Sequence, residues 1–154
     1  MPQLALHTRQ LTQIENDHVQ SAPTAGQQME AASVQAKYPL AVPRPTEVTF
    51  GYNCHGLTFA ARRTEIFSSS EVRRILQEDG YVRLGNLSDV VAGDIVLYIG
   101  DDGGIEHSGL VVECPALLPK IPRVLSKWGL GREFIHPFNY CPYPLVFEFH
   151  RLVR

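Results

Sequence analysis

The sequence has no excess of either charge, which makes a nucleic-acid partner unexpected. Its 154 residues carry a formal net charge of −2 at pH 7, with 19% charged residues and no basic stripe. No apolar stretch approaches the roughly 20 residues of a membrane-spanning helix. The polar N-terminal residues also lack the apolar central run of a secretory signal peptide. We therefore expect no membrane span, and a location in the cytoplasm or export by a route that needs no signal peptide.

Cysteine is scarce, and its few positions are far apart. The chain has three cysteines, Cys54, Cys114 and Cys141, an odd number without a closely spaced pair. This pattern argues against a disulfide framework and against a zinc site built from thiolates. A reducing compartment is the simplest match, and neither a metal nor another cofactor is expected. Cys114 and Cys141 are interpreted as ordinary thiols.

The composition divides the chain into two parts. Hydrophobic residues make up 44% of the sequence, enough for one domain with its own core. Residues 1–45 are rich in Gln, Ala, Thr and Ser and poor in aromatic residues, and residues 11–19 and 25–36 have helical spacing. We predict an N-terminal arm over residues 1–45, helical or partly disordered, followed by one domain over residues 46–154. A wholly disordered tail is the alternative that this composition leaves open.

Helical patterns come first in the predicted domain. One helix should begin at Cys54 and run to about Arg63. A second should follow Ser68, because Ser68 and Glu71 have the spacing of a capping box, and Gly80 should close it.

Strand patterns follow, with a period of two. Residues 95–99 and 105–113 should pair across a turn at residues 101–104, since Asp and Gly residues favour tight turns. Further strands are predicted over residues 81–84, 123–128, 134–137 and 145–153. Helices followed by a mainly antiparallel sheet predict the α+β class.

Cys54 stands at the start of a predicted helix, within the run Asn53-Cys54-His55-Gly56. A thiol in the first helical turn feels the positive end of the helix dipole, which favours the thiolate. Nucleophilic cysteines are often prepared in this way. The alternative for a lone cysteine is a buried thiol that acts as a small hydrophobic residue.

A cysteine nucleophile needs a base, and His107 is the best placed of the six histidines. It follows the predicted turn, and the small residues Ser108 and Gly109 beside it allow a helix or substrate to approach the strand closely. A sheet packed on the Cys54 helix would bring His107 to the thiol. The alternative is an ordinary histidine at a strand edge.

Two runs give the pattern a family resemblance. A cysteine that opens a helix, then Ala-Gly-Asp-Ile-Val-Leu-Tyr at 92–98 and His-Ser-Gly-Leu-Val-Val at 107–112, resembles the NlpC family of papain-like cysteine peptidases and amidases. It is also similar to the related CHAP amidohydrolases. The resemblance covers about residues 50–130 and implies a papain-like fold, with N-terminal helices packed on a mainly antiparallel sheet. It further implies Cys54 as nucleophile and His107 as base.

The third catalytic residue departs from the family pattern. Papain-type enzymes carry an orienting Asn in an Asn-Ser-Trp-Gly run, and Ser126-Lys127-Trp128-Gly129 stands at that place here. The resemblance therefore implies Ser126 as the residue that orients His107, with His136 and Glu133 as alternatives.

The function implied by the resemblance is hydrolysis of an amide bond by a Cys-His pair. The substrate would be a peptidoglycan peptide, a protein or another amide. The backbone N–H of Cys54 would stabilise the oxyanion together with Asn53 or Tyr52, while His55 and Trp128 would have structural or substrate-binding roles. Two alternatives are a toxin or effector deamidase of papain-like fold, and a catalytically weak papain-like domain that binds a partner.

Overall fold

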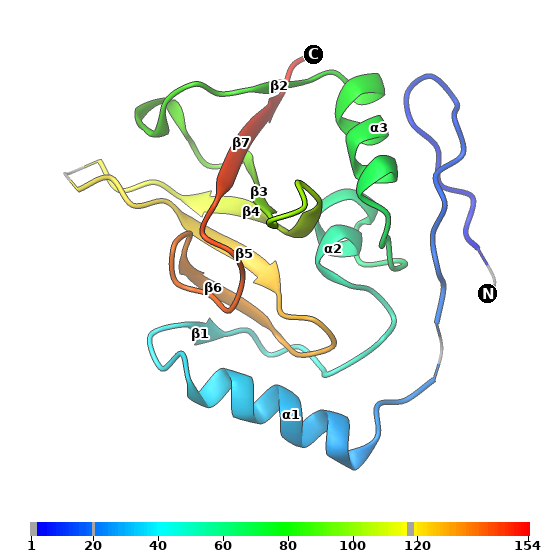
Figure 1. Cartoon of the computed structure of the whole chain (residues 1–154), viewed down its shortest axis with the longest axis vertical. Coiled ribbons are helices and arrows are strands. Elements are labelled where there is room, and N and C mark those ends of the chain that lie inside the picture. Colours follow the sequence, from blue (N-terminus) through cyan, green and yellow to red (C-terminus); the bar gives the residue numbers. More distant parts are fainter. Residues whose placement is uncertain (1–2, 20, 117–118) are drawn as a thin grey trace.

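The computed structural model describes residues 3–19, 21–116 and 119–154, and within them it confirms the α+β class (Figure 1). The helices are α1 (Ala25–Ala36), α2 (Cys54–Ala60), α3 (Ser69–Asp79) and a short 3-10 helix, η1 (Leu87–Asp89). The strands are β1 (Val42–Pro43), β2 (Tyr81–Arg83), β3 (Ile95–Ile99), β4 (Ile105–Glu113), β5 (Arg123–Lys127), β6 (Glu133–Pro137) and β7 (Phe147–Leu152).

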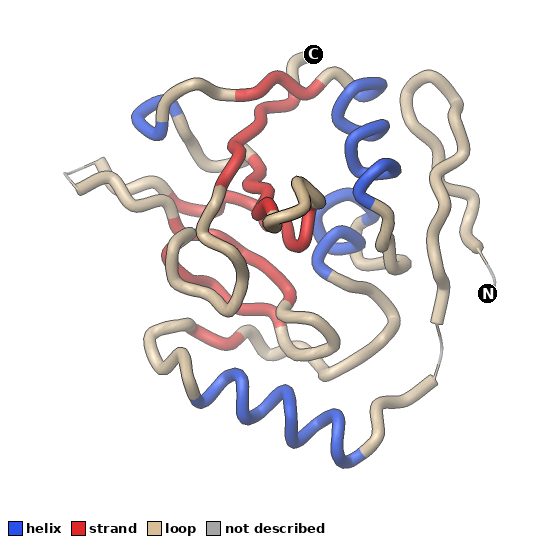
Figure 2. The backbone as a smooth tube through the Cα atoms, viewed as in Figure 1, coloured by secondary structure: helices blue, strands red, loops and turns tan. Residues whose placement is uncertain are grey.

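The seven strands of the described residues form one sheet in the order β1-β6-β5-β4-β3-β7-β2, and all neighbours are antiparallel. Figure 2 shows the strands in red and the helices around them in blue. β3 lies between β4 and β7, and its residues Ile95, Val96, Leu97 and Tyr98 are at most 2% exposed. A strand that is buried on both faces explains why this part of the sequence is apolar throughout.

Each face of the sheet has its own hydrophobic cluster. Leu97 packs with Ile75 of α3 in one cluster. Tyr98 belongs to the other cluster with Phe138, and Val34 of α1 packs against it. Since neighbouring residues of a strand point to opposite faces, the helices of the chain are divided between the two sides of the sheet.

The arm is extended where a helix over residues 11–19 was predicted, so that prediction was wrong. His7 pairs with Gln13 and Asp17 with Glu65 in isolated antiparallel bridges. The arm lies beside α3 (Figure 1), where the backbone N–H of Glu15 donates to Glu71. Glu65 and Glu71 lie far along the chain from the arm, so tertiary contacts outweighed the weak local helical pattern.

The predicted helix over residues 25–36 is confirmed as α1. Thr24 caps it in a capping box with Gln27. The capping box predicted at Ser68 was wrong, because Ser68 makes no side-chain cap bond and Glu71 accepts from Glu15 of the arm instead.

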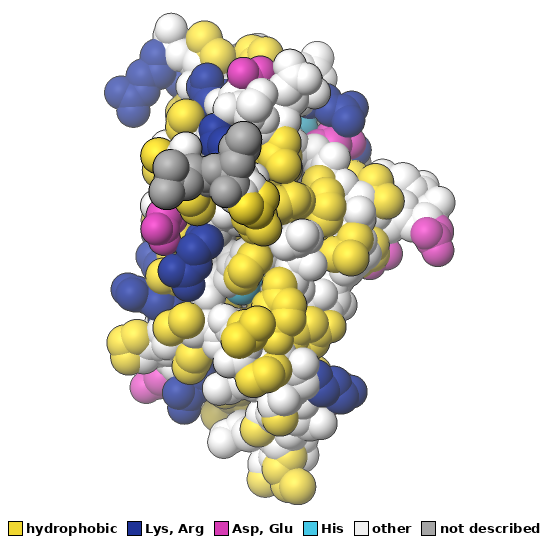
Figure 3. Space-filling view, turned by 90° about the vertical axis from the view of Figure 1, so that its left-hand side faces the viewer, with side chains coloured by type: hydrophobic (Ala, Val, Ile, Leu, Met, Phe, Trp, Pro, Cys, Tyr) yellow, Lys and Arg dark blue, Asp and Glu magenta, His cyan; other side chains and the backbone are white. Residues whose placement is uncertain are grey.

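Apolar side chains also reach the surface. Figure 3 shows that they gather in the middle of one face of the molecule, while most charged groups lie toward its margins. Among the exposed hydrophobic residues are Leu40, Val42, Leu145 and Val146. No helix in the described part of the chain is both long and apolar enough to cross a membrane.

Ile14 connects the arm to the core, because its side chain is 1% exposed and packs in the cluster on the α3 side of the sheet. We expect Ile14→Ala to lower the free energy of unfolding by about 2–5 kcal/mol, the usual cost of emptying a buried site. Leu11→Ala is the matched control, since Leu11 is 81% exposed, and it should change stability by less than about 0.5 kcal/mol. Denaturant unfolding measures both, and equal effects would contradict a core role for Ile14.

Candidate active site

Asn53 fixes the start of α2 and the place of Cys54. Its side-chain oxygen accepts from the backbone N–H of Gly56 at 2.9 Å and of Ile66 at 3.0 Å, and its amide donates to the Ile66 carbonyl at 2.7 Å. The helix is therefore capped and tied to residue 66 by one side chain. These bonds attach the Asn53 side chain to α2 and to residue 66, and its predicted role as an oxyanion donor stays a prediction.

Gly56 allows this close approach. A Cβ at this position would lie 1.8 Å from the carbonyl oxygen of Thr64, so any side chain would force α2 away from the following segment. α2 ends at Ala60, earlier than the predicted Arg63, because Ala61 and Arg62 adopt the left-handed conformation with φ of 49° and 64°.

A β-bulge sets the direction of His107. Tyr98 pairs with His107 and Ile99 with Ile105, so Glu106 is an extra residue in β4. The bulge reverses the alternation of the strand. Ile105 consequently packs in the cluster on the α3 side, while His107 lies beside Tyr98.

Aromatic rings hold the imidazole of His107. The ring of Tyr143 stacks on it at 3.6 Å between centroids with an interplanar angle of 7°, and the Tyr98 centroid lies 5.1 Å away. The side chain is fully buried, and neither ring nitrogen has a hydrogen-bond partner within the described residues. Buried polar atoms usually have hydrogen-bond partners, so a buried imidazole without one needs an explanation. A role in a reactive site is such an explanation.

The structure brings Cys54, His55 and His107 together as a charge-coupled group. Burial raises the pKa of the Cys54 thiol, but the charges of His55 and then His107 lower it well below its ordinary value. Burial lowers the pKa of His55, yet the nearby thiolate raises it overall. Burial also lowers the pKa of His107, and there it outweighs the opposing effect of Cys54. The arrangement therefore favours a thiolate.

His55 contributes more to the electrostatics of this site than the sequence predicted. Its Nδ1 lies 2.7 Å from Ser108 Oγ, and Ser108 in turn donates to Thr58 Oγ1 at 2.9 Å. Its Nε2 faces the carbonyl oxygen of Ile105 at 3.3 Å. Both nitrogens thus face acceptors, which favours the protonated ring and places a positive charge beside Cys54.

Ser126 does not orient His107, and that prediction was wrong. Its hydroxyl lies 2.7 Å from Nε2 of His136 on the neighbouring strand and accepts from Nε1 of Trp128 at 3.1 Å. The other nitrogen of His136 faces the Pro137 carbonyl at 2.7 Å. His136, the alternative third residue, is therefore also engaged elsewhere, and burial lowers its pKa to about 4.

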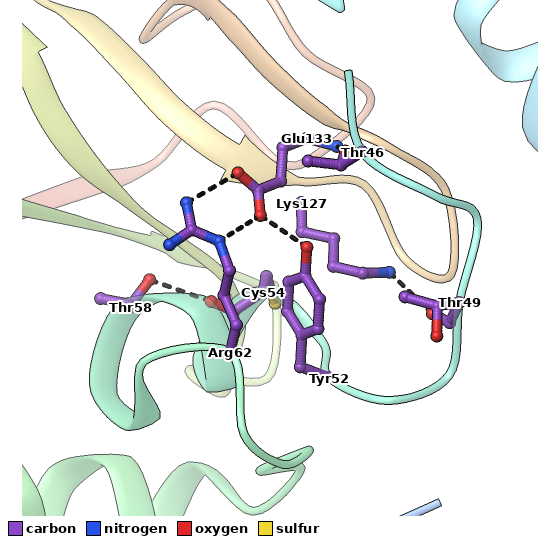
Figure 4. A network of polar contacts seen from close by, with 8 residues as sticks. All are labelled: Thr46, Thr49, Tyr52, Cys54, Thr58, Arg62, Lys127 and Glu133. Atoms are coloured by element: carbon purple, nitrogen blue, oxygen red, sulfur yellow. Dashed lines mark hydrogen bonds and ion pairs between the residues drawn. The ribbon is translucent and has the colours of Figure 1, made fainter. Parts of the chain in front are cut away.

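Glu133, the other alternative, is the centre of a separate network near Cys54 (Figure 4). It is 1% exposed and accepts from the Tyr52 hydroxyl at 2.5 Å and from Arg62 at 2.6 and 2.9 Å. The Tyr52 hydroxyl is thus committed to Glu133, which contradicts its predicted role as an oxyanion donor. Arg62, which follows α2, thus pairs with this buried carboxylate.

Lys127 places another positive charge near the thiol. It is fully buried, and its Nζ donates to the carbonyl oxygens of Thr49 at 3.0 Å and Gly129 at 2.7 Å. Burial lowers its pKa to about 8, against the opposing charges of Glu65, Cys54 and Glu133. The sequence shows only a lysine within a predicted strand, and that pattern does not indicate that its side chain is buried.

Two cavities flank the turn after β5. One of about 280 Å³ is lined by Trp128, Phe134 and Tyr143 together with residues of α1. The other, of about 450 Å³, borders Asn53, the residue that precedes Cys54. Trp128 is 6% exposed and stacks on Phe134, so it belongs to the core and also lines a cavity.

The fold and site together define an α+β protein with a buried thiol–imidazole centre. No family model matches this chain, and comparisons with curated proteins and with solved structures gave no match either. Within the part of the chain that the structure describes, no group of three or more His, Cys, Asp or Glu residues is arranged to hold a metal ion.

The lowered pKa of Cys54 predicts a thiolate at neutral pH. The ultraviolet thiolate absorbance, taken as the difference from Cys54→Ala, should persist at neutral pH and disappear only on acidification. His55→Gln and His107→Gln should each move this transition to higher pH, because each removes a charge that stabilises the thiolate. Cys114→Ala is the control and should leave the transition unchanged. An ordinary thiol titration above neutral pH in the unmodified protein would contradict the prediction.

Proposed function

We propose that this chain is a cysteine hydrolase of papain-like, NlpC-like type that cleaves an amide bond through Cys54 and His107. One observation carries the proposal. A thiol with a lowered pKa at the start of a helix is coupled to a buried imidazole whose nitrogens have no hydrogen-bond partner within the described residues. This pairing is what nucleophilic catalysis by cysteine requires.

The first half of the reaction forms a thioester. His107 takes the proton of Cys54, and the charge of the protonated His55 further favours the thiolate. The sulfur attacks the amide carbonyl, and the oxyanion is held by the N–H groups of Cys54 and His55. These N–H groups belong to the first turn of α2, where no intrahelical acceptor exists. His107 then protonates the amide nitrogen, the C–N bond breaks and the amine leaves.

The second half regenerates the enzyme. Water gives a proton to His107 and attacks the thioester carbon, the C–S bond breaks, and the acid is released as the thiolate reforms. The same steps describe a deamidase when the amide nitrogen is unsubstituted, and ammonia is then the first product. Release of ammonia from glutamine-containing peptides therefore distinguishes the deamidase from a peptidase.

A short-chain p-nitrophenyl ester tests the nucleophile, because acylation of the thiol releases a coloured phenolate. We expect a burst of phenolate and an acyl group on Cys54 by mass spectrometry. Cys54→Ala should abolish the burst, and His107→Ala should slow it by about 10²-fold or more, as expected for loss of a general base. Cys114→Ala should retain it. Acylation of Cys114 or Cys141 in place of Cys54 would contradict the proposal.

Tyr143 is proposed as the positioning residue for His107, in place of a hydrogen-bonding third residue. An aromatic pair contributes about 0.5–1.5 kcal/mol, so Tyr143→Ala should lower kcat/KM by up to about tenfold, whereas Tyr143→Phe should keep most of it. Solvent would also reach the imidazole in Tyr143→Ala. The limb of the pH profile that reports His107 should then move to higher pH, since burial lowers that pKa. An unchanged profile in Tyr143→Ala would contradict this role.

A binding role is the second candidate function. Cys54 is only 8% exposed, His107 is fully buried, and Tyr143 covers the imidazole. A closed site of this kind suits a papain-like domain that binds a partner without turnover. Acylation of Cys54 that is never followed by deacylation would favour this candidate over the hydrolase.

A further inference from the structure

The cavity that borders Asn53, the residue before Cys54, is lined by a carboxylate without a partner in the described residues. Glu65 is 7% exposed and lines the cavity of about 450 Å³ that borders Asn53. Within the described residues, its carboxylate makes no hydrogen bond and no ion pair. A mostly buried carboxylate that has no partner in the protein and lines a cavity is available to a cation or a hydrogen-bond donor.

A second carboxylate lies at the same wall. Asp17 and Glu65 exchange two backbone hydrogen bonds of 2.9 Å, so the bridge places their side chains as neighbours, and both residues line the cavity. Burial and then the charges of Asp17 and Cys54 raise the pKa of Glu65, to about 7, against the opposing effect of Lys127. A bound cation would relieve this repulsion between like charges.

The lysine and arginine side chains of the described residues do not pair with these two carboxylates. Among the described residues that line the cavity there is no lysine or arginine. Lys127 acts on Glu65 only through its charge, because its Nζ is bonded to the carbonyl oxygens of Thr49 and Gly129.

Most of the remaining lining is apolar and comes from Val19, Phe50, Phe67 and Leu130, while Ser21 and Asn53 are its other polar residues. The carboxylates at one wall would bind an ammonium group, and the apolar side chains around them would contact the hydrocarbon chain that carries it. A metal ion would instead seek several oxygen ligands and would gain nothing from the apolar walls.

We propose that this cavity binds a primary ammonium group of the substrate, through Glu65 and Asp17, while the amide of the same molecule lies at Cys54. The inference rests on the proposed hydrolase and narrows its substrate to amides that carry an amine. Asn53 adjoins both the cavity and the nucleophile, so the two groups of the substrate lie close together. The amine can be a lysine-like side chain or a free α-amino group, and the two share the same recognition chemistry.

A set of matched chloroacetamides tests the proposal through the rate of alkylation of Cys54. Their alkyl chains end in an ammonium, a hydroxyl or a methyl group, and a further compound carries the amine in the α position. The second-order rate is measured by mass spectrometry on the full chain. We expect the ammonium compound to react at least about tenfold faster than the hydroxyl compound, as one charge-assisted hydrogen bond supplies about 1.5–3 kcal/mol. The preferred amine position identifies which of the two sources the cavity accepts.

Variants assign the preference to the two carboxylates. Glu65→Gln should remove most of the ammonium-over-hydroxyl ratio, and Asp17→Asn should reduce it. Asp101→Asn makes the same change in net charge at an exposed turn and should leave the ratio unchanged. A ratio near one in the unmodified protein, or a ratio that survives Glu65→Gln, would overturn the inference. Failure of every compound to alkylate Cys54 would instead count against the proposed hydrolase.

Discussion

The hydrogen bonds of one side chain, Asn53, hold the site together. They begin α2, so that Cys54 lies in its first turn, and they attach the helix to Ile66. Gly56 permits the close contact that these bonds require. Because the chain between Gly56 and Ile66 is fixed in this way, Glu65 is also held at the cavity wall.

The electrostatics of the site follow from burial of several charges near one thiol. His55, His107 and Lys127 are all buried, and each contributes to the field around Cys54. Water is largely excluded there, so these interactions act at a low effective dielectric and favour the thiolate. The imidazole of His107 stacks on Tyr143, and neither of its nitrogens has a hydrogen-bond partner within the described residues. This is a physical difference from the triad expected on resemblance to papain-like enzymes.

The N-terminal arm is part of both the core and the site. Ile14 packs beneath α3, and Asp17 lies opposite Glu65 at the cavity. Residues of α1 line the second cavity beside Trp128 and Tyr143. A segment that looked separable by composition thus supplies walls to both cavities, which connects the proposed specificity for an amine to the arm.

Local patterns in the sequence were enough to predict α1, α3 and the β3–β4 hairpin. Helical spacing, turn residues and alternation are encoded within a few positions, so a single sequence shows them. The bulge at Glu106, the pairing of Ser126 with His136 and the bridge between Asp17 and Glu65 were decided by the tertiary structure. Each of these features depends on a residue that is distant in the sequence or lies diagonally across the sheet, and that forms the hydrogen bond or the packing contact. No local sequence pattern specifies which residue this is.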